Sequence, residues 1–571
     1  MAAVVLVMLA ARLILVSTHF DPAYDQSMLL ANFPLSHPAD VLRPLPYFEQ
    51  TTTLGHAILM DLLGRVFGPE GMARIDAIRL LTALAFCAAL PLFYAVLRAG
   101  LTPTEAILSV AILGSSPTTV VFSANSKHYG FEFIATIMLL AAAMYYLRHP
   151  SLRRGLIVVM AGLAVSLFAF TAPLIIAAIG LAVLAVQAKE SAAKNLPAPE
   201  KRQRIARTLT LGLTLVAIAG FFYLGYTRVV TVYDLVAFAD RDAARHIEPF
   251  APLSQQSLRT ALEYGTYLFK FFELGLEEFE TPERRIRIIM ALPVLPLYVA
   301  GLYTLWRRAP FWVLCAVAAP ALTLLLNMAG AVPFSGVRQH LFAAPLVGPV
   351  LVVGLVAIIR RLAGMIRTPR VANVVIAALA VTSIALSVIG STRPRNLIGD
   401  MIDRIEASGA PVWAYYGAQP IIRTLRPGWM EGQGSPALGL LPHTSSNARW
   451  LRLARFDDDS GMRPEYYRAS MAAIAGTDRL WLVFANWQFD FAHKSGLELF
   501  LRPLRGPGRD CGIWNHTTRA LIAFCGPVAD VTSLRQQLPG DISAEWDLTT
   551  ASGAWLRYVK GTAGDLVRAS N

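Results

Sequence analysis

The chain has 571 residues, of which 55% are hydrophobic and only 16% are charged, and its mean hydropathy is +0.49. This composition excludes a water-soluble enzyme of this length and predicts an integral membrane protein. The formal net charge of +13 would suggest nucleic-acid binding if it were evenly spread, but residues 391–571 hold 20 Lys and Arg against 17 Asp and Glu. The surplus therefore lies in the apolar part of the chain, where no nucleic acid is needed to explain it.

Apolar segments long enough to cross about 30 Å of hydrocarbon recur through the first 390 residues and are absent afterwards. The sequence therefore predicts an α-helical membrane domain of about eleven transmembrane helices, residues 1–390, followed by a mixed α/β domain, residues 391–571. The expected spans are residues 2–17, 75–97, 105–122, 129–147, 156–170, 172–187, 208–227, 286–306, 310–328, 341–359 and 371–390.

Short loops between these spans are strongly basic, which is typical of the cytoplasmic side of a membrane protein. If the amino terminus is cytoplasmic, alternation places every one of these loops inside. It also places residues 18–74, 123–128, 228–285 and 329–340 outside, together with the C-terminal domain. The basic residues are Arg98, Arg148, Arg153, Arg154, Lys189, Lys194, Lys201, Arg202, Arg204, Arg207, Arg307, Arg308, Arg360, Arg361, Arg367 and Arg370, and they are opposed only by Glu105, Glu190 and Glu200.

Two outer segments have apolar residues at helical spacing together with charged residues. Residues 54–67 contain His56, Asp61 and Arg65, and residues 258–279 combine aromatic side chains with several acids. These patterns predict amphipathic helices that lie along the membrane surface rather than cross it. We expect such helices to border a lateral entry for a lipid.

The C-terminal domain has β-rich runs at residues 411–416, 479–485 and 520–524, and helical patterns at 398–407 and 464–475. Cys511 and Cys525 lie on the expected oxidising side, where they either form a disulfide or remain two unpaired thiols. The domain is also rich in Trp and Tyr, which either contact carbohydrate or pack in a core. They are Trp413, Tyr415, Tyr416, Trp429, Trp450, Tyr466, Tyr467, Trp481 and Trp487.

Acidic residues in the first outer loop are candidates for chemistry at the membrane surface. Sugar transfer from a lipid phosphate to a hydroxyl needs a base for the acceptor proton and cationic help for the departing phosphate. Asp25, with Asp21 four residues earlier, follows the first span directly. The alternative is that both are ordinary solvated loop carboxylates.

Four segments in order resemble the GT-C superfamily of polyprenyl-phosphate-sugar-dependent glycosyltransferases, especially relatives of protein O-mannosyltransferases and lipid A aminoarabinose transferase. Residues 20–26, Phe-Asp-Pro-Ala-Tyr-Asp-Gln, stand where that family has an acidic motif, and the stretch from residue 54 to 81 is similar to its interfacial helix and second-span entry. Residues 115–129 resemble the outer turn between the third and fourth spans, and residues 332–340 resemble the late outer loop. One departure is that Gln26, not a second acid, follows Asp25.

This resemblance implies an inverting single displacement in which Asp25, alone or with Asp21, is the catalytic base. It implies that Arg338 faces the lipid-linked phosphate, with Lys127, His128, Tyr129 and His340 as further substrate-binding residues. An arginine in a very short outer loop suits bidentate phosphate binding. The alternatives are headgroup-anchoring cations and an interfacial aromatic residue.

The expected partners are a polyprenyl-phosphate sugar donor, membrane lipids, and a carbohydrate, lipid or protein acceptor. No nucleotide cofactor is required. His37 and His56 have no spacing typical of a metal site, so no metal ligand is assigned, although the family's acid pair leaves room for a divalent metal. Asp457, Asp458 and Asp459 are interpreted as a solvated loop.

Glu132, just inside the fourth span, is either functional or paired with Lys127 or His128. The competing function is a multi-span transporter or lipid flippase with an accessory outer domain. Transporters place polar residues near the bilayer midplane, whereas the span centres here are almost wholly apolar. The sequence therefore favours a multi-pass protein of the plasma (inner) membrane with an extracytoplasmic C-terminal domain.

Overall fold

The computed structural model describes most of the membrane domain and part of the C-terminal domain. The side chains of Asp25 and Arg338 lie outside the described part, as do Asp21, the expected helix at 258–279, the acids at 457–459, and almost all of the expected helix at 464–475. The described residues are 1–17, 24–43, 45, 52–68, 72–193, 197–227, 254–255, 257, 294–329, 337–365, 367–391, 398–414, 418–426, 474, 476–485, 501–517 and 520–538.

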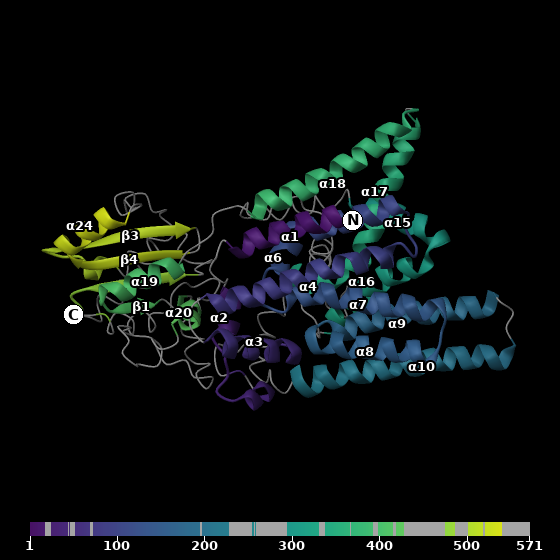
Figure 1. Cartoon of the computed structure of the whole chain (residues 1–571), viewed down its shortest axis with the longest axis horizontal. Coiled ribbons are helices and arrows are strands. Elements are labelled where there is room, and N and C mark those ends of the chain that lie inside the picture. Colours follow the sequence, from purple (N-terminus) through teal and green to yellow (C-terminus); the bar gives the residue numbers. More distant parts are fainter. Residues whose placement is uncertain are drawn as a thin grey trace.

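The membrane domain is a bundle of long, apolar helices (Figure 1). Between the first two long helices, the outer loop forms α2 (Tyr24–Leu30), the 3-10 helix η1 (Pro38–Leu42) and α3 (Leu54–Phe67). The bundle consists of α1 (Ala2–Ser17), α4 (Ala73–Leu97), α5 (Pro103–Ser115), α6 (Pro117–Ser123), α7 (Tyr129–Arg148), α8 (Leu152–Phe168), α9 (Ala172–Ala193), α10 (Ala198–Gly220) with the π-helix η2 (Phe221–Thr227), α15 (Val294–Arg308), α16 (Pro310–Met328), the 3-10 helix η6 (Val337–Ala343), α17 (Ala344–Met365) and α18 (Pro369–Ser391).

Each of the eleven expected spans coincides, at least in part, with a described helix. Six stretches are both long and apolar enough to cross a membrane, which supports an integral membrane protein. The count of about eleven spans stays a prediction, because three further apolar helices are shorter. The six are Ala73–Leu97, Tyr129–Arg148, Ala172–Ala192, Ala198–Gly225, Pro310–Met328 and His340–Met365, and the shorter three are Ala2–Ser17, Pro103–Ser115 and Arg370–Ala385.

The span expected at 105–122 is not one continuous helix. It is broken between α5 and α6 at Ser116, whose side chain caps α6 by accepting a hydrogen bond from the Thr119 amide at 3.2 Å. Pro117 stands at the first position of α6, where its missing amide hydrogen does no harm. The hydroxyl of Thr119 also donates to the carbonyl of Leu113 at 2.5 Å. The Ser-Pro step therefore bends the chain at a defined place.

Arg12 of α1 is fully buried beside this break. Its guanidinium donates to Gly114 O at 2.8 Å, to Ser123 Oγ at 2.6 Å and to its own helix at Met8 O. It also lies 4.4 Å from the ring centroid of Phe86. A broken helix leaves carbonyls without intrahelical partners, and in an apolar interior these need another donor. Arg12 is that donor, and it fixes α1 to both halves of the break.

We expect Arg12→Met to reduce the free energy of unfolding by about 1–3 kcal/mol, because the Gly114 carbonyl would lose a charged donor in an apolar interior. Unfolding by SDS or heat in detergent micelles measures the effect. Arg154→Met is the matched control, since exposed Arg154 also bonds a carbonyl, that of Tyr145, and lies 4.2 Å from the Tyr145 ring centroid. Equal stability of Arg12→Met and the wild type would contradict this role.

The two ends of the bundle differ in charge and in what covers them. Arg308, between α15 and α16, pairs with Glu105 at the start of α5 at 2.7 Å. In Figure 1 the α9–α10 turn lies at the right, whereas α2, α3 and the C-terminal domain lie at the left. The basic ends of α9 and α10 are therefore remote from α2 and α3.

The C-terminal domain contains a four-stranded sheet in the order β1-β2-β4-β3. Strands β1 and β2 are parallel, and the other neighbours are antiparallel. Cys511 on β3 lies directly opposite Cys525 on β4, and the two form a disulfide, which confirms that alternative. Its elements are α19 (Ile398–Ser408), β1 (Val412–Ala414), α20 (Gln419–Leu425), β2 (Leu480–Ala485), η9 (Arg502–Leu504), β3 (Arg509–Thr517), β4 (Ala520–Pro527) and α24 (Val528–Gln537).

Two of the aromatic residues considered for carbohydrate binding belong to the core of this sheet. Trp413 and Trp481 are fully buried, and Trp481 packs against Trp514 and Phe524. Burial of this kind leaves no ring face for a sugar, so the core-packing alternative holds for these two. The other seven aromatic residues lie outside the described part of the chain.

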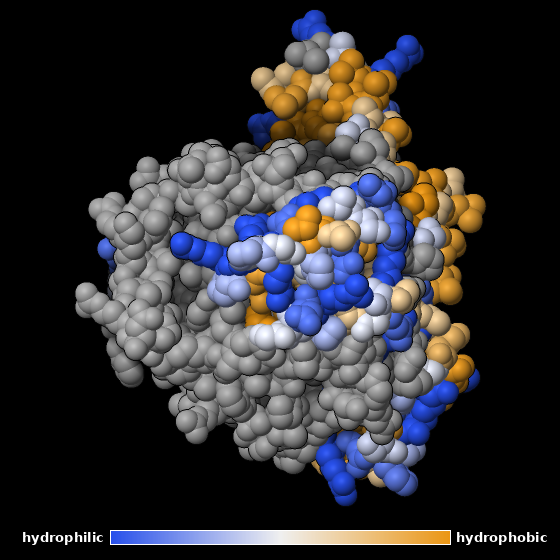
Figure 2. All heavy atoms as spheres, turned by 90° about the vertical axis from the view of Figure 1, so that its left-hand side faces the viewer, coloured by the Kyte–Doolittle hydropathy of each residue, from blue (hydrophilic) through white to orange (hydrophobic). Residues whose placement is uncertain are grey.

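The two parts of the molecule also differ in the hydropathy of their surfaces. Viewed from the C-terminal domain, the described atoms at the centre are mostly hydrophilic (Figure 2). Hydrophobic side chains gather instead on the projecting helices α17 and α18 at the top of that view, including the exposed Met365, Val374 and Val381. A helix pair with such a surface suits contact with lipid.

Candidate functional site

The candidate site lies where the first outer loop meets the start of α7. Asp25 is the second residue of α2, and the side chain of its neighbour Gln26 is buried. Gln26 Oε1 accepts a hydrogen bond from the hydroxyl of Ser126 at 3.1 Å. The glutamine that departs from the family's acid pair therefore joins α2 to the segment that precedes α7.

That segment, residues 124–128, is held in a tight turn. The Asn125 side chain accepts a hydrogen bond from the Lys127 amide at 2.8 Å, a local contact that favours turns. Lys127 is only 6% exposed, and its ammonium lies 5.9 Å from the ring centroid of Tyr129. Burial lowers the pKa of Lys127 from 10.5 to about 7. The lysine can thus exchange its proton near neutral pH.

Two buried histidines flank this turn. His56 of α3 lies with Nε2 3.1 Å from the carbonyl of Ser126, and its ring centroid is 6.0 Å from that of His128. A carbonyl only accepts, so Nε2 of His56 carries the hydrogen. Burial lowers the pKa of His56 to about 4 and that of His128 well below its usual value. Both imidazoles are therefore neutral at pH 7.

Close packing of α3 places His56 there. A Cβ on Gly55 would lie 2.9 Å from both the Leu167 carbonyl and the Phe168 ring, so only glycine lets the start of α3 approach the end of α8. The sequence pattern predicted a helix at 54–67, and α3 confirms it. It did not show that His56 and His128 would meet.

Glu132 has partners different from those considered in the sequence. Its carboxylate accepts hydrogen bonds from the Phe170 amide at 2.8 Å, from the Thr171 amide at 3.3 Å and from the Thr171 hydroxyl. These groups lie just before α9, where a helix N-terminus favours an acid. The expected pairing of Glu132 with Lys127 or His128 is therefore wrong, because its carboxylate binds Phe170 and Thr171 instead. Glu132 ties α7 to the turn between α8 and α9.

The late outer loop approaches the same helix. In η6, the carbonyl of Phe342 accepts a hydrogen bond from the hydroxyl of Thr136 at 3.1 Å, and this fixes η6 beside α7. Arg338 is the second residue of η6, and its side chain lies outside the described part. His340 is fully buried. The backbone at Asp25 therefore lies near the turn that carries Lys127, and η6, which carries Arg338, packs on the helix that follows this turn.

The described residues offer no cluster of three or more His, Cys, Asp or Glu side chains that could hold a metal ion. His56 and His128 lie beside the cation-forming Lys127, a neighbour that disfavours a bound cation.

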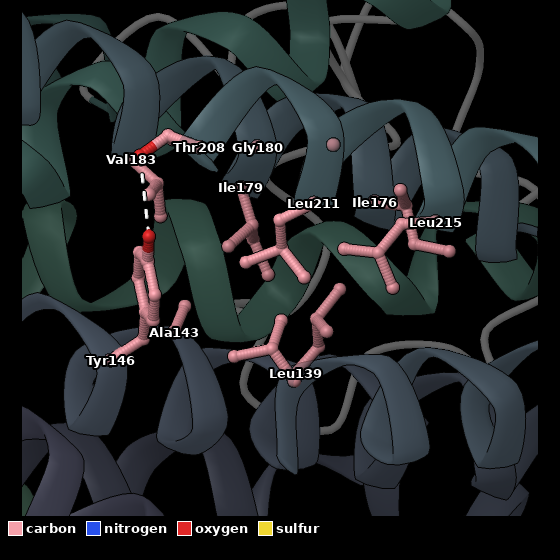
Figure 3. Close-up of a pocket in the computed structure, with 12 residues that line it drawn as sticks. Leu139, Ala143, Tyr146, Ile176, Ile179, Gly180, Val183, Thr208, Leu211 and Leu215 are labelled. Atoms are coloured by element: carbon pink, nitrogen blue, oxygen red, sulfur yellow. Dashed lines mark hydrogen bonds between the residues drawn. The ribbon is translucent and has the colours of Figure 1, made fainter. Parts of the chain in front are cut away.

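A cavity elsewhere in the bundle is not a substrate site. It encloses about 30 Å³ between α7, α8, α9 and α10 and is lined mainly by aliphatic side chains such as Leu139, Ile176 and Leu215 (Figure 3). At one side Tyr146 and Thr208 share a hydrogen bond of 3.4 Å. About 30 Å³ is the share of a single water in the liquid, far too little for a sugar or a prenyl chain.

Comparison with known proteins finds likeness at the level of structure only. No family model matches the chain, and no curated protein matches it. The structure of ArnT from Cupriavidus metallidurans bound to undecaprenyl phosphate has a TM-score of 0.47 and 12% identity, covering 92% of this chain and 98% of that one.

An oligosaccharyltransferase from Archaeoglobus fulgidus, solved with Zn and sulfate, has a TM-score of 0.46 and 12% identity, covering 83% of this chain and 67% of that one. The oligosaccharyltransferase AglB from Archaeoglobus fulgidus, solved with an inhibitory peptide and a dolichol-phosphate, has a TM-score of 0.42 and 12% identity, covering 83% of this chain and 69% of that one. At 12% identity the likeness to these structures is one of fold.

Proposed function

We propose that this protein is a membrane glycosyltransferase that moves a sugar from a polyprenyl-phosphate-linked donor to an extracytoplasmic acceptor, which is an envelope glycan, a lipid or a protein. The observation that carries this proposal is the hydrogen bond that joins α2 to the 124–128 turn, together with the packing of η6 on α7, the helix that follows this turn. An acid-bearing helix beside cationic residues at a membrane surface suits chemistry on a lipid-linked phosphate.

In this reaction Asp25 accepts the proton of the acceptor hydroxyl as that oxygen attacks the anomeric carbon. The bond from this carbon to the phosphate oxygen breaks, and the lipid phosphate leaves with the bonding electron pair. A single displacement of this kind inverts the anomeric centre. Asp21, four residues before Asp25, assists in the same loop.

Lys127 and Arg338 stabilise the developing charge on the leaving phosphate. A protonated lysine in a buried turn is a strong partner for an anion, because little solvent screens the pair. His128 and Tyr129 border the same turn, and His340 is buried in η6. In this proposal the donor phosphate binds to Lys127 and Arg338 close to Asp25.

The side of the membrane follows from charge. The basic turns lie remote from α2 and the C-terminal domain, and basic loops stay in the cytoplasm. The Cys511–Cys525 disulfide suits an oxidising compartment for the C-terminal domain. We therefore assign the site and this domain to the extracytoplasmic side of the plasma (inner) membrane.

A transfer assay tests the proposal directly. Purified protein in proteoliposomes is supplied with a panel of radiolabelled polyprenyl-phosphate sugars or with the matching nucleotide sugars, together with a cell-envelope extract as acceptor. We expect release of free polyprenyl phosphate and label in the acceptor only with the lipid-linked donor. Transbilayer movement of the lipid without consumption of the sugar would instead establish the flippase.

A further inference from the structure

The C-terminal domain and the first outer loop share one hydrophobic core. Leu29, Leu30 and Phe33 from the outer loop belong to the same buried cluster as Ile421 and Ile422 of α20 and residues of the β-sheet. In Figure 1, α20 lies beside α2 at the junction of the two parts. The C-terminal domain is therefore not an independent appendage, since it completes the core around α2.

Directional contacts fix α20 to α2 within this core. The hydroxyl of Thr424 on α20 is shared between the carbonyl of Ser27, at 3.0 Å, and that of Pro420 on its own helix, at 2.7 Å. Ser27 is two residues from Asp25, and both Thr424 and Ser27 are fully buried. A hydrogen bond in such a dry place restricts position more than an exposed one does.

Arg74 at the start of α4 braces the same junction. Its guanidinium donates to the carbonyl of Thr424 at 2.6 Å and to the carbonyl of Phe33, just beyond the end of α2. Arg74 is only 4% exposed. One buried cation thus connects the membrane domain, the exit of α2 and the C-terminal helix α20.

The helix held by these contacts has little stability of its own. Helix α2 has seven residues, and helices of that length do not persist without tertiary contacts. Gln26 holds it to Ser126 on the membrane-domain side, and Thr424 holds it on the C-terminal side. The position of residue 25 relative to Lys127 therefore depends on both domains.

From these contacts we infer that the C-terminal domain positions the base of the reaction, with Thr424 as a positioning residue that sets α2 through the Ser27 carbonyl. This inference rests on the proposed function for the role of Asp25. Thr424 does not touch the substrate. It acts by holding the acid-bearing helix against the turn that carries Lys127.

The kinetic test compares Thr424→Val, which loses the hydroxyl, with Thr424→Ser, which keeps it. We expect Thr424→Val to lower kcat about tenfold with an unchanged KM for the donor lipid, because misplacing a base slows chemistry more than binding. Thr424→Ser should retain wild-type kcat. Thr532→Val is the matched control, since the Thr532 hydroxyl donates within its own helix α24, to the Val528 carbonyl at 2.8 Å.

A labelling experiment separates this inference from the proposed function, because it needs no activity. Asp25→Cys is made alone and combined with each threonine variant, and its modification by a charged, membrane-impermeant thiol reagent is timed. The other cysteines interfere little, because Cys87 and Cys315 are buried and Cys511 is bonded to Cys525. We expect about fivefold faster labelling with Thr424→Val, and an unchanged rate with Thr424→Ser and Thr532→Val.

Unchanged labelling at position 25 in the Thr424→Val background would overturn the inference, whatever the kinetics. A rate change shared by Thr532→Val would also overturn it, because that would indicate general loosening of the domain. If wild-type protein transfers no sugar from any lipid-linked donor, the proposed function fails, and the labelling rates still decide whether Thr424 positions α2.

Discussion

Asp25→Asn is expected to reduce sugar transfer by about 1,000-fold or more, with the protein still folded in the membrane. The amide has nearly the same shape as the carboxylate but cannot accept the acceptor proton. Residue 25 lies in the first turn of α2, next to Gln26, whose bond to Ser126 brings this turn to the segment that carries Lys127. The loss should appear in kcat, because the interaction forms only as the proton moves.

Asp40→Asn is the control for Asp25→Asn, because Asp40 is an acid of the same outer loop. Its carboxylate accepts from the His37 amide at 3.0 Å and pairs with Arg43 at 3.1 Å, so its structural role is already accounted for. We expect near wild-type transfer from Asp40→Asn. Substantial transfer by Asp25→Asn would remove Asp25 from the mechanism, and Asp21→Asn would then be the next variant to measure.

Lys127→Met is expected to lower kcat/KM for the donor lipid about 100-fold, because the developing phosphate charge loses a buried cation. Steady-state kinetics with a purified polyprenyl-phosphate sugar in proteoliposomes measure this loss. The sugar-linked phosphate is a diester, whose charge does not change between about pH 6 and 9. A change of rate with pH in this range therefore reports on protein groups.

The pH dependence should identify Lys127. Its pKa of about 7 means that the free enzyme carries the cation below pH 7 and loses it as the pH rises. We expect kcat/KM to fall above about pH 7 in the wild type, and this fall to be absent in Lys127→Met. His56 and His128 do not contribute, because burial holds the pKa of His56 at about 4 and that of His128 well below its usual value.

The pH dependence of stability distinguishes the lower kcat/KM of Lys127→Met from misfolding of this variant. Because the pKa of Lys127 is lowered from 10.5 to about 7, the folded state binds fewer protons than the unfolded state between these values. The lysine's contribution to stability therefore rises with pH through that window and is least favourable below pH 7. Lys127→Met should be at least as stable as the wild type at pH 6. If kcat/KM of Lys127→Met still fell above about pH 7, Lys127 would be excluded as the group that causes the fall.

Much of the membrane domain could be predicted from local composition. Each expected span coincides with a described helix, because about 20 consecutive apolar residues have few stable alternatives in a bilayer. The sequence left a disulfide and two unpaired thiols open for Cys511 and Cys525, and the structure has the disulfide, whereas the strands at 480–485 and 520–527 were predicted from their β-rich runs. The single span predicted at 105–122 is wrong at Ser116, because Pro117 has no amide hydrogen to continue the helix of α5 although the residues around it are apolar.

The candidate site was predicted only as separate segments. Sequence order could place Asp25, Lys127 and Arg338 on one side of the membrane, but not at one place in the plane of the membrane. Gln26 illustrates this limit, because the sequence shows it only as a departure from the pair of acids that the family has at this place. Its hydrogen bond to Ser126, 100 residues away, gives it a reason to be there.

By itself, the sequence determined the membrane class, most of the described helices and the distribution of charge between the loops, because these depend on residues close together in the chain; the partition into two domains stays a prediction. Only the tertiary structure decided that Arg12 holds the α5–α6 break, that two neutral histidines flank Lys127, and that Thr424 bonds Ser27 across 397 residues. These contacts depend on how buried surfaces fit in three dimensions. That fit leaves no periodic signal in a single sequence.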